Sequence, residues 1–400
     1  DGECVMIDKF RTRQGHLDVP SAVPTGISGY NGFRARWWAR AGALALLLIA
    51  ALVVAVGERN QAAAAQHTTI DPSPLTQVSL TQTVMSSWYR GTLTGHPNEI
   101  NSAALSPDGR TLATVGREVV LWDLSDRRHP RRLGQPHTGH TEPVISVAFS
   151  SNGHTVATGS ADSSVILWDV TDPRHPRRLG RALAGPGWVV SVVFSPDGRT
   201  LATASGDRTI DLWDVTDRTQ PRRLGQSLVA FAGAVAFSPD GRTLAIPSED
   251  RAVTLWDITD RSRPRRLDQP LTGHADAVVT VVFSPDRRTL ATASFDRIVM
   301  LWDVTDRIRP RRLGQPLFGP ADSLASVVFS PDGRILATAS DDETVILWDL
   351  TDRNQPRRLG RPLTDHISGA RSVAFSSDGH TLVTVSDDGT VTLWDITRGI

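Results

Sequence analysis

The sequence predicts an all-β fold in which seven four-stranded blades surround a central axis, that is, a seven-bladed β-propeller. The first observation is the tripeptide Leu-Trp-Asp, which occurs seven times, with tryptophan at Trp122, Trp168, Trp213, Trp256, Trp302, Trp348 and Trp394. The second is the spacing, because successive tryptophans are 46, 45, 43, 46, 46 and 46 residues apart. A period in the forties built of short β-rich segments is typical of propeller blades.

The unit from His274 to Asp303 shows the pattern of one blade. We expect three short strands, separated by turns that contain Pro, Asp and Arg, at 277–283, 289–294 and 298–302. These segments consist of β-branched and apolar residues, which favour strands. A fourth strand is expected at 311–317, after the turn Asp-Val-Thr-Asp.

The two ends of the repeat region complement each other. The last unit contains three strand patterns before Ile400, whereas residues 84–94 resemble the fourth-strand pattern of the other units. We therefore expect strand 84–94 to pair with the last blade, which would leave the ring without an exposed edge. The propeller is assigned to residues 84–400.

An uncharged apolar run precedes the repeats, at 41–56 (AGALALLLIAALVVAV). Extended by Gly57, it lies at the short end of the roughly 17–25 residues that span a bilayer. The preceding residues are basic and aromatic, with Arg34, Arg36, Arg40, Trp37 and Trp38. We expect a basic and aromatic flank and a transmembrane helix over 34–57, with the propeller outside the cytoplasm by the positive-inside bias. The predicted location is a cell membrane, crossed once.

Two other interpretations of the run stay open. It could be a buried core helix, although nothing nearby would cover it. It could also be a signal peptide, because Ala62–Ala65 offers small residues for cleavage, although Glu58 and Arg59 interrupt the stretch. We favour the uncleaved anchor. Residues 58–83, rich in Ala, Gln, Thr, Ser and Pro, are expected to form a linker, and residues 1–33 show no assignable pattern.

The composition limits the possible functions. The chain of 400 residues carries 43 Lys+Arg and 43 Asp+Glu, so net charge gives no reason to expect nucleic acid as a partner. The single cysteine, Cys4, excludes an internal disulfide framework and a cysteine zinc site. No G-x-S-x-G, P-loop, H-E-x-x-H or dinucleotide motif occurs. We therefore expect no enzyme activity, no cofactor, no metal and no small-molecule substrate.

Residues 84–400 resemble the WD-repeat β-propeller family. The likeness rests on the seven Leu-Trp-Asp motifs, the Ser-Pro-Asp-Gly turns and three Gly-His pairs, Gly95-His96, Gly139-His140 and Gly273-His274. The repeat style and the near absence of lysine (only Lys9) resemble bacterial, actinomycete-like WD-repeat proteins. The resemblance implies a structural tetrad of His, Ser or Thr, Asp and Trp in each complete blade, here His140, Thr158, Asp162 and Trp168; His274, Thr292, Asp296 and Trp302; and His366, Thr384, Asp388 and Trp394.

Four blades depart from this pattern. Blades three and six lack the histidine, and blade four also has Ile246 in place of the threonine. Blade one lacks the turn aspartate. We therefore expect blades one and four to be the least rigid. Because the His-Thr-Asp set recurs at equivalent places, we interpret it as structural and not as a catalytic triad.

A Pro-Arg-Arg-Leu motif recurs before six fourth strands, for example at Arg311-Arg312. A ring of arginine pairs could contact phosphates or an acidic membrane. We favour a structural reading, in which the charges protect outer strands from edge pairing and the aspartates of the turns neutralise them.

The resemblance also implies a partner-binding face, at positions six and four residues before the Phe that ends each first strand and just before each tetrad Asp. In blades one and two these positions include Glu99, Asn101 and Ile145. The candidate partner-binding residues are Trp188, Val190, Phe231, Glu249, Val279, Phe295, Asp341, Arg371 and Asp387. Apolar groups cluster on blades three to five and charges on blades six, seven and one, which is typical of an interaction site. Alternatively, Trp188 and Phe231 fill space left by the missing Gly-His pairs.

We therefore expect a membrane-tethered, non-catalytic scaffold that binds a protein or peptide. The alternative is the sensor or autoinhibitory half of a larger bacterial signalling protein with an NTPase, kinase or protease-like effector domain.

Overall fold

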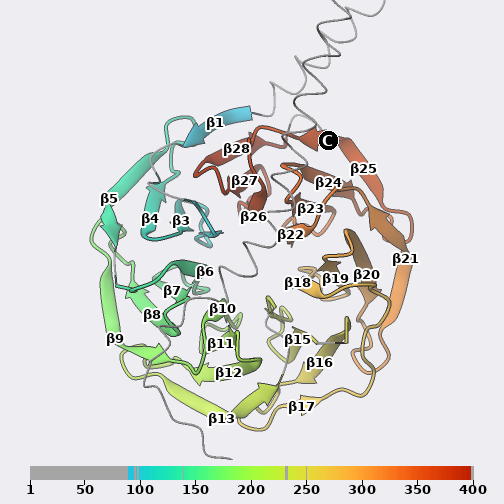
Figure 1. Cartoon of the computed structure of the whole chain (residues 1–400), viewed down its shortest axis with the longest axis horizontal. Helices are drawn as coiled ribbons and strands as arrows, with labels where there is room; N and C mark the ends of the chain where they lie inside the picture. The colour runs from blue at the N-terminus through green and yellow to red at the C-terminus, as the bar shows by residue number, and fades with distance from the viewer. Residues whose placement is uncertain are drawn as a thin grey trace, which may run out of the picture. The chain divides into compact units, whose positions relative to one another are not determined.

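Seven antiparallel sheets, each with four strands, form a ring in the computed structural model (Figure 1). The structure describes residues 89–93, 96, 99–137, 139–229, 233–248 and 250–397. The expected all-β propeller of seven four-stranded blades is confirmed. In each blade the first strand lies nearest the axis and the fourth strand lies on the rim.

The strands of the first four blades are as follows. Blade one contains β2 (Ser102–Leu105), β3 (Thr111–Val115), β4 (Val119–Asp123) and β5 (Arg131–His137). Blade two contains β6 (Val144–Phe149), β7 (Thr155–Ser160), β8 (Ser164–Asp169) and β9 (Arg177–Ala184). Blade three contains β10 (Val189–Phe194), β11 (Thr200–Ser205), β12 (Thr209–Asp214) and β13 (Arg222–Val229). Blade four contains β14 (Ala236–Phe237), β15 (Thr243–Pro247), β16 (Val253–Asp257) and β17 (Arg265–Arg266).

The other three blades follow the same order. Blade five contains β18 (Val278–Phe283), β19 (Thr289–Ser294), β20 (Ile298–Asp303) and β21 (Arg311–Phe318). Blade six contains β22 (Leu324–Phe329), β23 (Ile335–Ser340), β24 (Val345–Asp349) and β25 (Arg357–Leu363). Blade seven contains β26 (Ala370–Phe375), β27 (Thr381–Ser386), β28 (Val391–Asp395) and β1 (Tyr89–Leu93).

Burial follows the position of each strand in its blade. The second strands of blades two to seven, such as β19 with the sequence TLATAS, are buried along their whole length, and β3 of blade one is buried except at its first residue. Both faces of such a strand are covered by neighbouring blades, so its sequence is apolar or small throughout. The rim strands begin with exposed arginines and bury mainly one leucine near their end, as in β21.

The hydrophobic core lies between adjacent blades. One cluster joins Ala291 and Leu301 of blade five to Val327, Leu336 and Trp348 of blade six. The tryptophan of each Leu-Trp-Asp motif therefore stabilises a contact with the preceding blade as well as its own sheet. Burial of such a side chain contributes roughly 2–3 kcal/mol.

The ring closes by pairing strands from opposite ends of the repeat region. Strand β1 runs antiparallel to β28, with Tyr89 opposite Trp394 and Leu93 opposite Val391. One residue of irregularity separates Tyr89 from Gly91. Residues 84–88 and 94 of the segment expected here lie outside the described residues.

The features expected before the ring lie outside the described residues: the unassigned segment 1–33, the helix and its flank at 34–57, and the linker 58–83. Among the residues that the structure describes, no helix has the length and apolar character needed to cross a bilayer.

Blade four is the least regular blade. Its first strand, β14, and its rim strand, β17, each contain two residues, whereas the equivalent strands of blade five contain six and eight. A single bridge between Val253 and Leu271 continues the rim pairing. The blade that lacks both the tetrad histidine and threonine therefore has the shortest ladders.

Candidate functional site

In blade two, the four expected tetrad residues contact one another. His140 Nε2 lies 2.8 Å from Thr158 Oγ1, and His140 Nδ1 lies 3.0 Å from Asp162 Oδ2. Trp168 Nε1 donates to Thr158 Oγ1 at 3.0 Å. The arrangement fits a neutral imidazole that donates from Nδ1 to the carboxylate. Burial lowers the pKa of His140, although Asp162 opposes the shift, so the neutral form is favoured.

Blade five repeats this geometry. His274 lies 2.8 Å from Thr292 Oγ1 and 2.9 Å from Asp296 Oδ2, and Trp302 donates to Thr292 at 3.0 Å. Asp296 also accepts from the backbone N–H of Ala275, which fixes the segment before the first strand.

Blade seven contains the same four residue types with one altered contact. His366 Nε2 lies 2.7 Å from Thr384 Oγ1, and Trp394 donates to Thr384 at 2.9 Å. The nearest oxygen of Asp388 is 3.7 Å from His366 Nδ1, which instead lies 3.1 Å from the hydroxyl of Thr390. Burial lowers the pKa of His366 as well.

The blades without a complete set still satisfy their tryptophans. Trp213 donates to Thr203 at 3.0 Å in blade three, and Trp348 donates to Thr338 at 3.3 Å in blade six. In blade four, where Ile246 replaces the threonine, Trp256 donates to Thr254 of its own strand at 3.1 Å. Sequence reasoning missed Thr254, although its position two residues before the tryptophan was the available signal.

The tetrads have no geometry for catalysis of a substrate. Their threonines and tryptophans are buried, and in blades two and five the histidine is held between the threonine and the aspartate. Within the described ranges, no group of three or more His, Cys, Asp and Glu side chains could hold a metal.

One face of the ring consists of the segments before each first strand and the turns between each second and third strand. We call it the tetrad face, because the histidines and aspartates of the tetrads belong to these segments and turns. The candidate partner-binding residues that the structure describes lie on this face or at its inner edge. Val190 and Val279 occupy bulges, because the pairing register shifts between Val189 and Ser191 and between Val278 and Thr280. A bulge re-aims the side chain of the extra residue, and both valines are half-buried.

Two aromatic residues of this face differ in their surroundings. Trp188 is half-buried, and its indole lies over Gly206, where a Cβ atom would meet Trp188 Nε1 at 1.0 Å. Trp188 therefore covers the position just before Asp207, where other blades carry a side chain. Phe295 is 41% exposed in a blade that keeps its complete tetrad.

The charged candidates form one inter-blade cluster. Arg371 Nη1 lies 2.8 Å from Asp341 Oδ1 of blade six, and Arg371 Nε lies 2.7 Å from Asp387 Oδ2 of blade seven. Burial raises the pKa of Asp341, and the nearby carboxylates of Asp322 and Asp387 add to this against the charge of Arg371. The cluster joins blades six and seven, next to blade five, which carries Phe295. Phe231 and Glu249 lie outside the described residues.

The opposite face, which we call the turn face, consists of the turns between first and second strands and between third and fourth strands. Three arginines of the latter turns reach aspartates of the preceding blade in a contact that we call the arginine clasp. The pairs, each at 2.8 Å, are Arg127–Asp378, Arg261–Asp197 and Arg353–Asp286.

These clasps correct one expectation. The turn aspartates were expected to neutralise the Pro-Arg-Arg pairs, but their ion pairs are with the single arginine that follows Thr-Asp or Ser-Asp. The arginine pairs instead lie exposed on the rim strands, with the first arginine opposite the aspartate of Leu-Trp-Asp, as in Asp303 and Arg311. Burial raises the pKa of Asp197, but bonds from Arg261 and Ser195 outweigh it and lower the pKa to about 2.

Comparison with known proteins agrees with this architecture. The family model described as "WD domain, G-beta repeat" (WD40) matches seven stretches, at 88–123, 132–169, 177–214, 230–257, 265–303, 313–349 and 357–395. Each stretch ends at the last residue of a third strand, and most begin in the rim strand of the preceding blade, so a matched unit is offset from a structural blade by one strand.

Three curated proteins are similar over shorter stretches. The NAD(+) hydrolase ApTIR of an Actinoplanes species is 50% identical over 74 residues, which are 18% of this chain and 10% of that protein. The 66 kDa stress protein of Physarum polycephalum is 33% identical over 89 residues, 22% of this chain and 14% of that protein. The human intraflagellar transport protein 122 homolog is 41% identical over 67 residues, 16% and 5% of the two chains.

The chain thus spans a small fraction of the length of each of these relatives. The seven matched repeats, in contrast, cover more than half of the chain and agree in number with its seven blades, so the chain belongs to the WD40-repeat family.

Proposed function

We propose that the ring is a non-catalytic scaffold that binds a protein or peptide on its tetrad face, near Phe295. WD40 propellers are commonly interaction scaffolds, and seven WD40 repeats match this chain. The observation that carries the proposal is the exposure of Phe295 in blade five. Because His274, Thr292 and Trp302 already fill the tetrad there, the ring of Phe295 has no vacancy to occupy.

The surroundings of Phe295 support a preformed site. Its backbone N–H donates to Ala277 O at 3.1 Å, and the side chain of Arg297 reaches Ala321 O at 3.2 Å. The turn that carries Phe295 is thus fixed both to its own first strand and to the segment that leads into blade six. A surface fixed in this way loses little conformational entropy when a partner binds.

The arrangement of charge supports a polar border for the site. Arg371 joins Asp341 to Asp387, so two blades present a cluster that is already paired internally. An apolar centre with a polar border is typical of transient protein interfaces. In this proposal the partner contacts Phe295, Val279 and Val190, and the cluster limits the site on the blade-six side.

The membrane location is part of the same proposal. Residues 41–57 would anchor the chain in a cell membrane as a single span, and the arginines before them would place the propeller on the extracytoplasmic side. We also propose a bacterial, actinomycete-like source, which the arginine-rich repeats with a single lysine support.

Affinity capture with the full chain tests the scaffold. The bait would be compared with Phe295→Ala and with the control Ile308→Ala, which removes an apolar side chain that is 59% exposed on the turn face of the same blade. We expect a specific protein to be captured by the wild type and the control, and lost with Phe295→Ala. Equal capture by all three chains, with all of them folded by circular dichroism, would contradict the site.

A second candidate function is regulation of a signalling enzyme by the same ring, as a sensor or autoinhibitory element. The similarity to part of a protein named as an NAD(+) hydrolase favours it, because a related stretch of 74 residues occurs there in a protein named for a catalytic activity. The activity of the captured protein would be measured with and without the ring. A change in that activity favours regulation, whereas constant activity favours the scaffold.

A further inference from the structure

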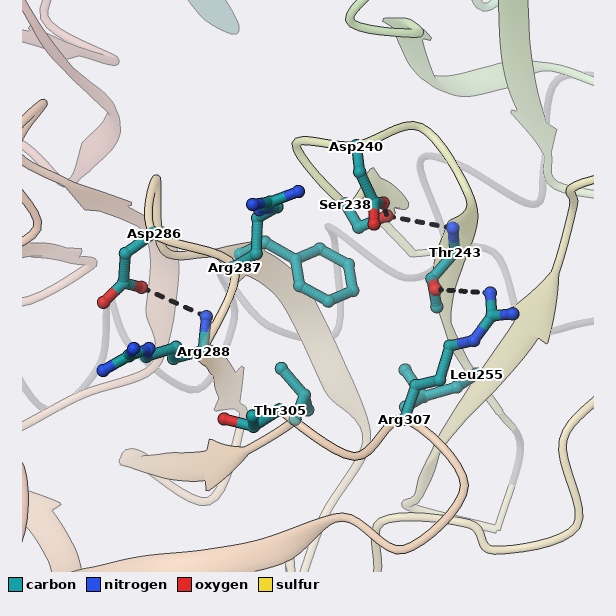
Figure 2. Close-up of a pocket in the computed structure, with 11 residues that line it drawn as sticks. Ser238, Asp240, Thr243, Leu255, Asp286, Arg287, Arg288, Thr305 and Arg307 are labelled. Atoms are coloured by element: carbon teal, nitrogen blue, oxygen red, sulfur yellow. Dashed lines mark hydrogen bonds between the residues drawn. The ribbon is translucent and has the colours of Figure 1, made fainter.

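The turn face contains a cavity of about 300 Å³ at the seam between blades four and five (Figure 2). We call it the seam pocket. Its floor is apolar, with Leu255, Phe283 and Val304, and its charged lining includes three arginines, Arg287, Arg288 and Arg307, and two aspartates, Asp240 and Asp286.

The pocket is marked by a break in the repeat. In the other six blades the turn between the first and second strands has glycine at positive φ, at Gly109, Gly153, Gly198, Gly241, Gly333 and Gly379. In blade five this position is Arg287, which has φ +66°. A residue with a side chain has a higher free energy in this left-handed region, whereas glycine does not. A non-glycine residue held in that region suggests a function when no local contact accounts for it.

The backbone N–H of Arg287 donates to Ser284 O at 2.9 Å, as the glycines do in the equivalent turns, but within the ring that the structure describes no short contact holds its side chain. Its guanidinium makes no hydrogen bond or ion pair with another residue in the part of the chain that the structure describes. Figure 2 shows its side chain between Asp286 and Asp240, beside the cavity. The neighbouring Arg288 side chain is likewise exposed and without such a bond among the described residues.

The arginine clasp is also altered at this seam. By analogy with Arg353–Asp286, Arg307 would pair with Asp240 of blade four. Instead, Arg307 Nη2 lies 3.0 Å from Asp257 Oδ2, and its Nη1 donates to Thr243 Oγ1 at 3.4 Å. Figure 2 shows this side chain crossing toward Thr243. Because Thr243 Oγ1 accepts from Arg307, its own hydroxyl hydrogen can be donated to a ligand.

The two carboxylates in the lining are already supplied with donors. Asp240 accepts from the Ser238 hydroxyl and the backbone N–H of Arg242. Asp286 accepts from the Ser284 hydroxyl and pairs with Arg353 at 2.8 Å. The charges of Arg287 and Arg288 interact with the carboxylates of Asp240 and Asp303, but neither guanidinium makes a short hydrogen bond within the described residues, so the N–H donors of both can be offered to a ligand at the mouth of the pocket.

We propose that the seam pocket binds a phosphate group, with Arg287 as its principal ligand, Arg288 as a second charged donor and Thr243 as a neutral donor. A planar guanidinium matches two oxygens of a phosphate and gives strong charge-assisted hydrogen bonds. The volume suits a small phosphate monoester or the headgroup of an anionic lipid. This site is on the face opposite Phe295 and does not depend on the scaffold proposal.

The test uses the full chain in detergent, with inorganic phosphate added against chloride at equal ionic strength. The site variant is Arg287→Gly, which restores the glycine of the other blades, and the control is Arg334→Gln, which removes one exposed arginine from the equivalent turn of blade six. Without phosphate, Arg287→Gly should unfold at the same or a higher temperature than the wild type, because the turn is relieved of strain. A loss of binding would then not be a loss of folding.

We expect phosphate to raise the unfolding temperature of the wild type and of Arg334→Gln, and calorimetric affinity to fall about tenfold or more in Arg287→Gly. Co-sedimentation with phosphatidic acid vesicles, compared with phosphatidylcholine vesicles, distinguishes a lipid source: binding that requires Arg287 would assign the group to a headgroup. If neither phosphate nor phosphatidic acid binds the wild type, or if Arg287→Gly and Arg334→Gln lose binding equally, the proposal is wrong.

Discussion

Blades four and five are neighbours with different means of support, and the difference shows what the tetrad contributes. In blade five, Thr292 accepts a hydrogen bond from the indole N–H of Trp302 and contacts His274. The first strand of this blade contains six residues and its rim strand eight. In blade four, Trp256 bonds to Thr254 within its own strand, and the equivalent strands have two residues each. The tetrad therefore joins the segment before the first strand to the third strand. Short ladders at both edges accompany the loss of both histidine and threonine in blade four, whereas blades three and six, which lack only the histidine, keep first strands of six residues.

The largest expected effect is a difference in stability between substitutions at Thr292 of blade five and Thr254 of blade four. Thr292→Val should leave two buried partners, His274 Nε2 and Trp302 Nε1, without a hydrogen bond, and should lower the free energy of unfolding by about 3 kcal/mol. Thr254→Val leaves one donor, Trp256 Nε1, and should cost about 1 kcal/mol. Urea unfolding at neutral pH measures both, and equal losses would show that the tetrad adds nothing to blade five.

A second effect concerns pH. Burial lowers the pKa of His140 and His366 from the ordinary 6.5, so below that pH the unfolded chain binds protons that the folded chain does not. Stability should therefore be full above pH 6.5 and should fall as the pH drops below it, until the folded pKa is passed. His140→Gln removes one of these groups and should flatten the slope of stability against pH. Urea midpoints measured from about pH 7.5 to 4.5 test this, and an unchanged slope would contradict a neutral buried histidine.

The smallest effect concerns the turn face. Asp197→Asn removes the clasp between blades three and four, where both side chains are partly exposed, and should cost about 0.5 kcal/mol at pH 7. Because the pKa of Asp197 is lowered to about 2, its contribution is present above 3.8 and disappears as the pH falls toward 2. Wild type and variant should thus converge in stability in acid. A constant difference across this range would assign the loss to packing and not to charge.

Local repetition made the fold predictable. The seven Leu-Trp-Asp motifs gave the number of blades, and the spacing from His140 to Thr158, Asp162 and Trp168 placed four residues that the structure brings together. Such contacts lie within one blade, so the register of neighbouring strands determines them.

Contacts between blades could not be predicted from the sequence as readily as contacts within a blade. Arg127 and Asp378 are 251 positions apart, and their pairing depends on how the first and last blades meet. The Arg371 cluster depends on the side-chain geometry of two blades, and the placement of Trp188 over Gly206 depends on the absence of a side chain there. A repeat period carries no information on such departures, and the candidate site consists of them.

The most direct test of the scaffold account is amide hydrogen exchange of the ring with and without its captured partner. The account predicts slower exchange in the turn that carries Phe295, between β19 and β20, and no change in the turn between β20 and β21, which carries Ile308. Both turns belong to blade five, so a general stabilisation of the blade would slow exchange in both. Protection of the turn near Ile308 alone, or of neither turn, would contradict binding on the tetrad face.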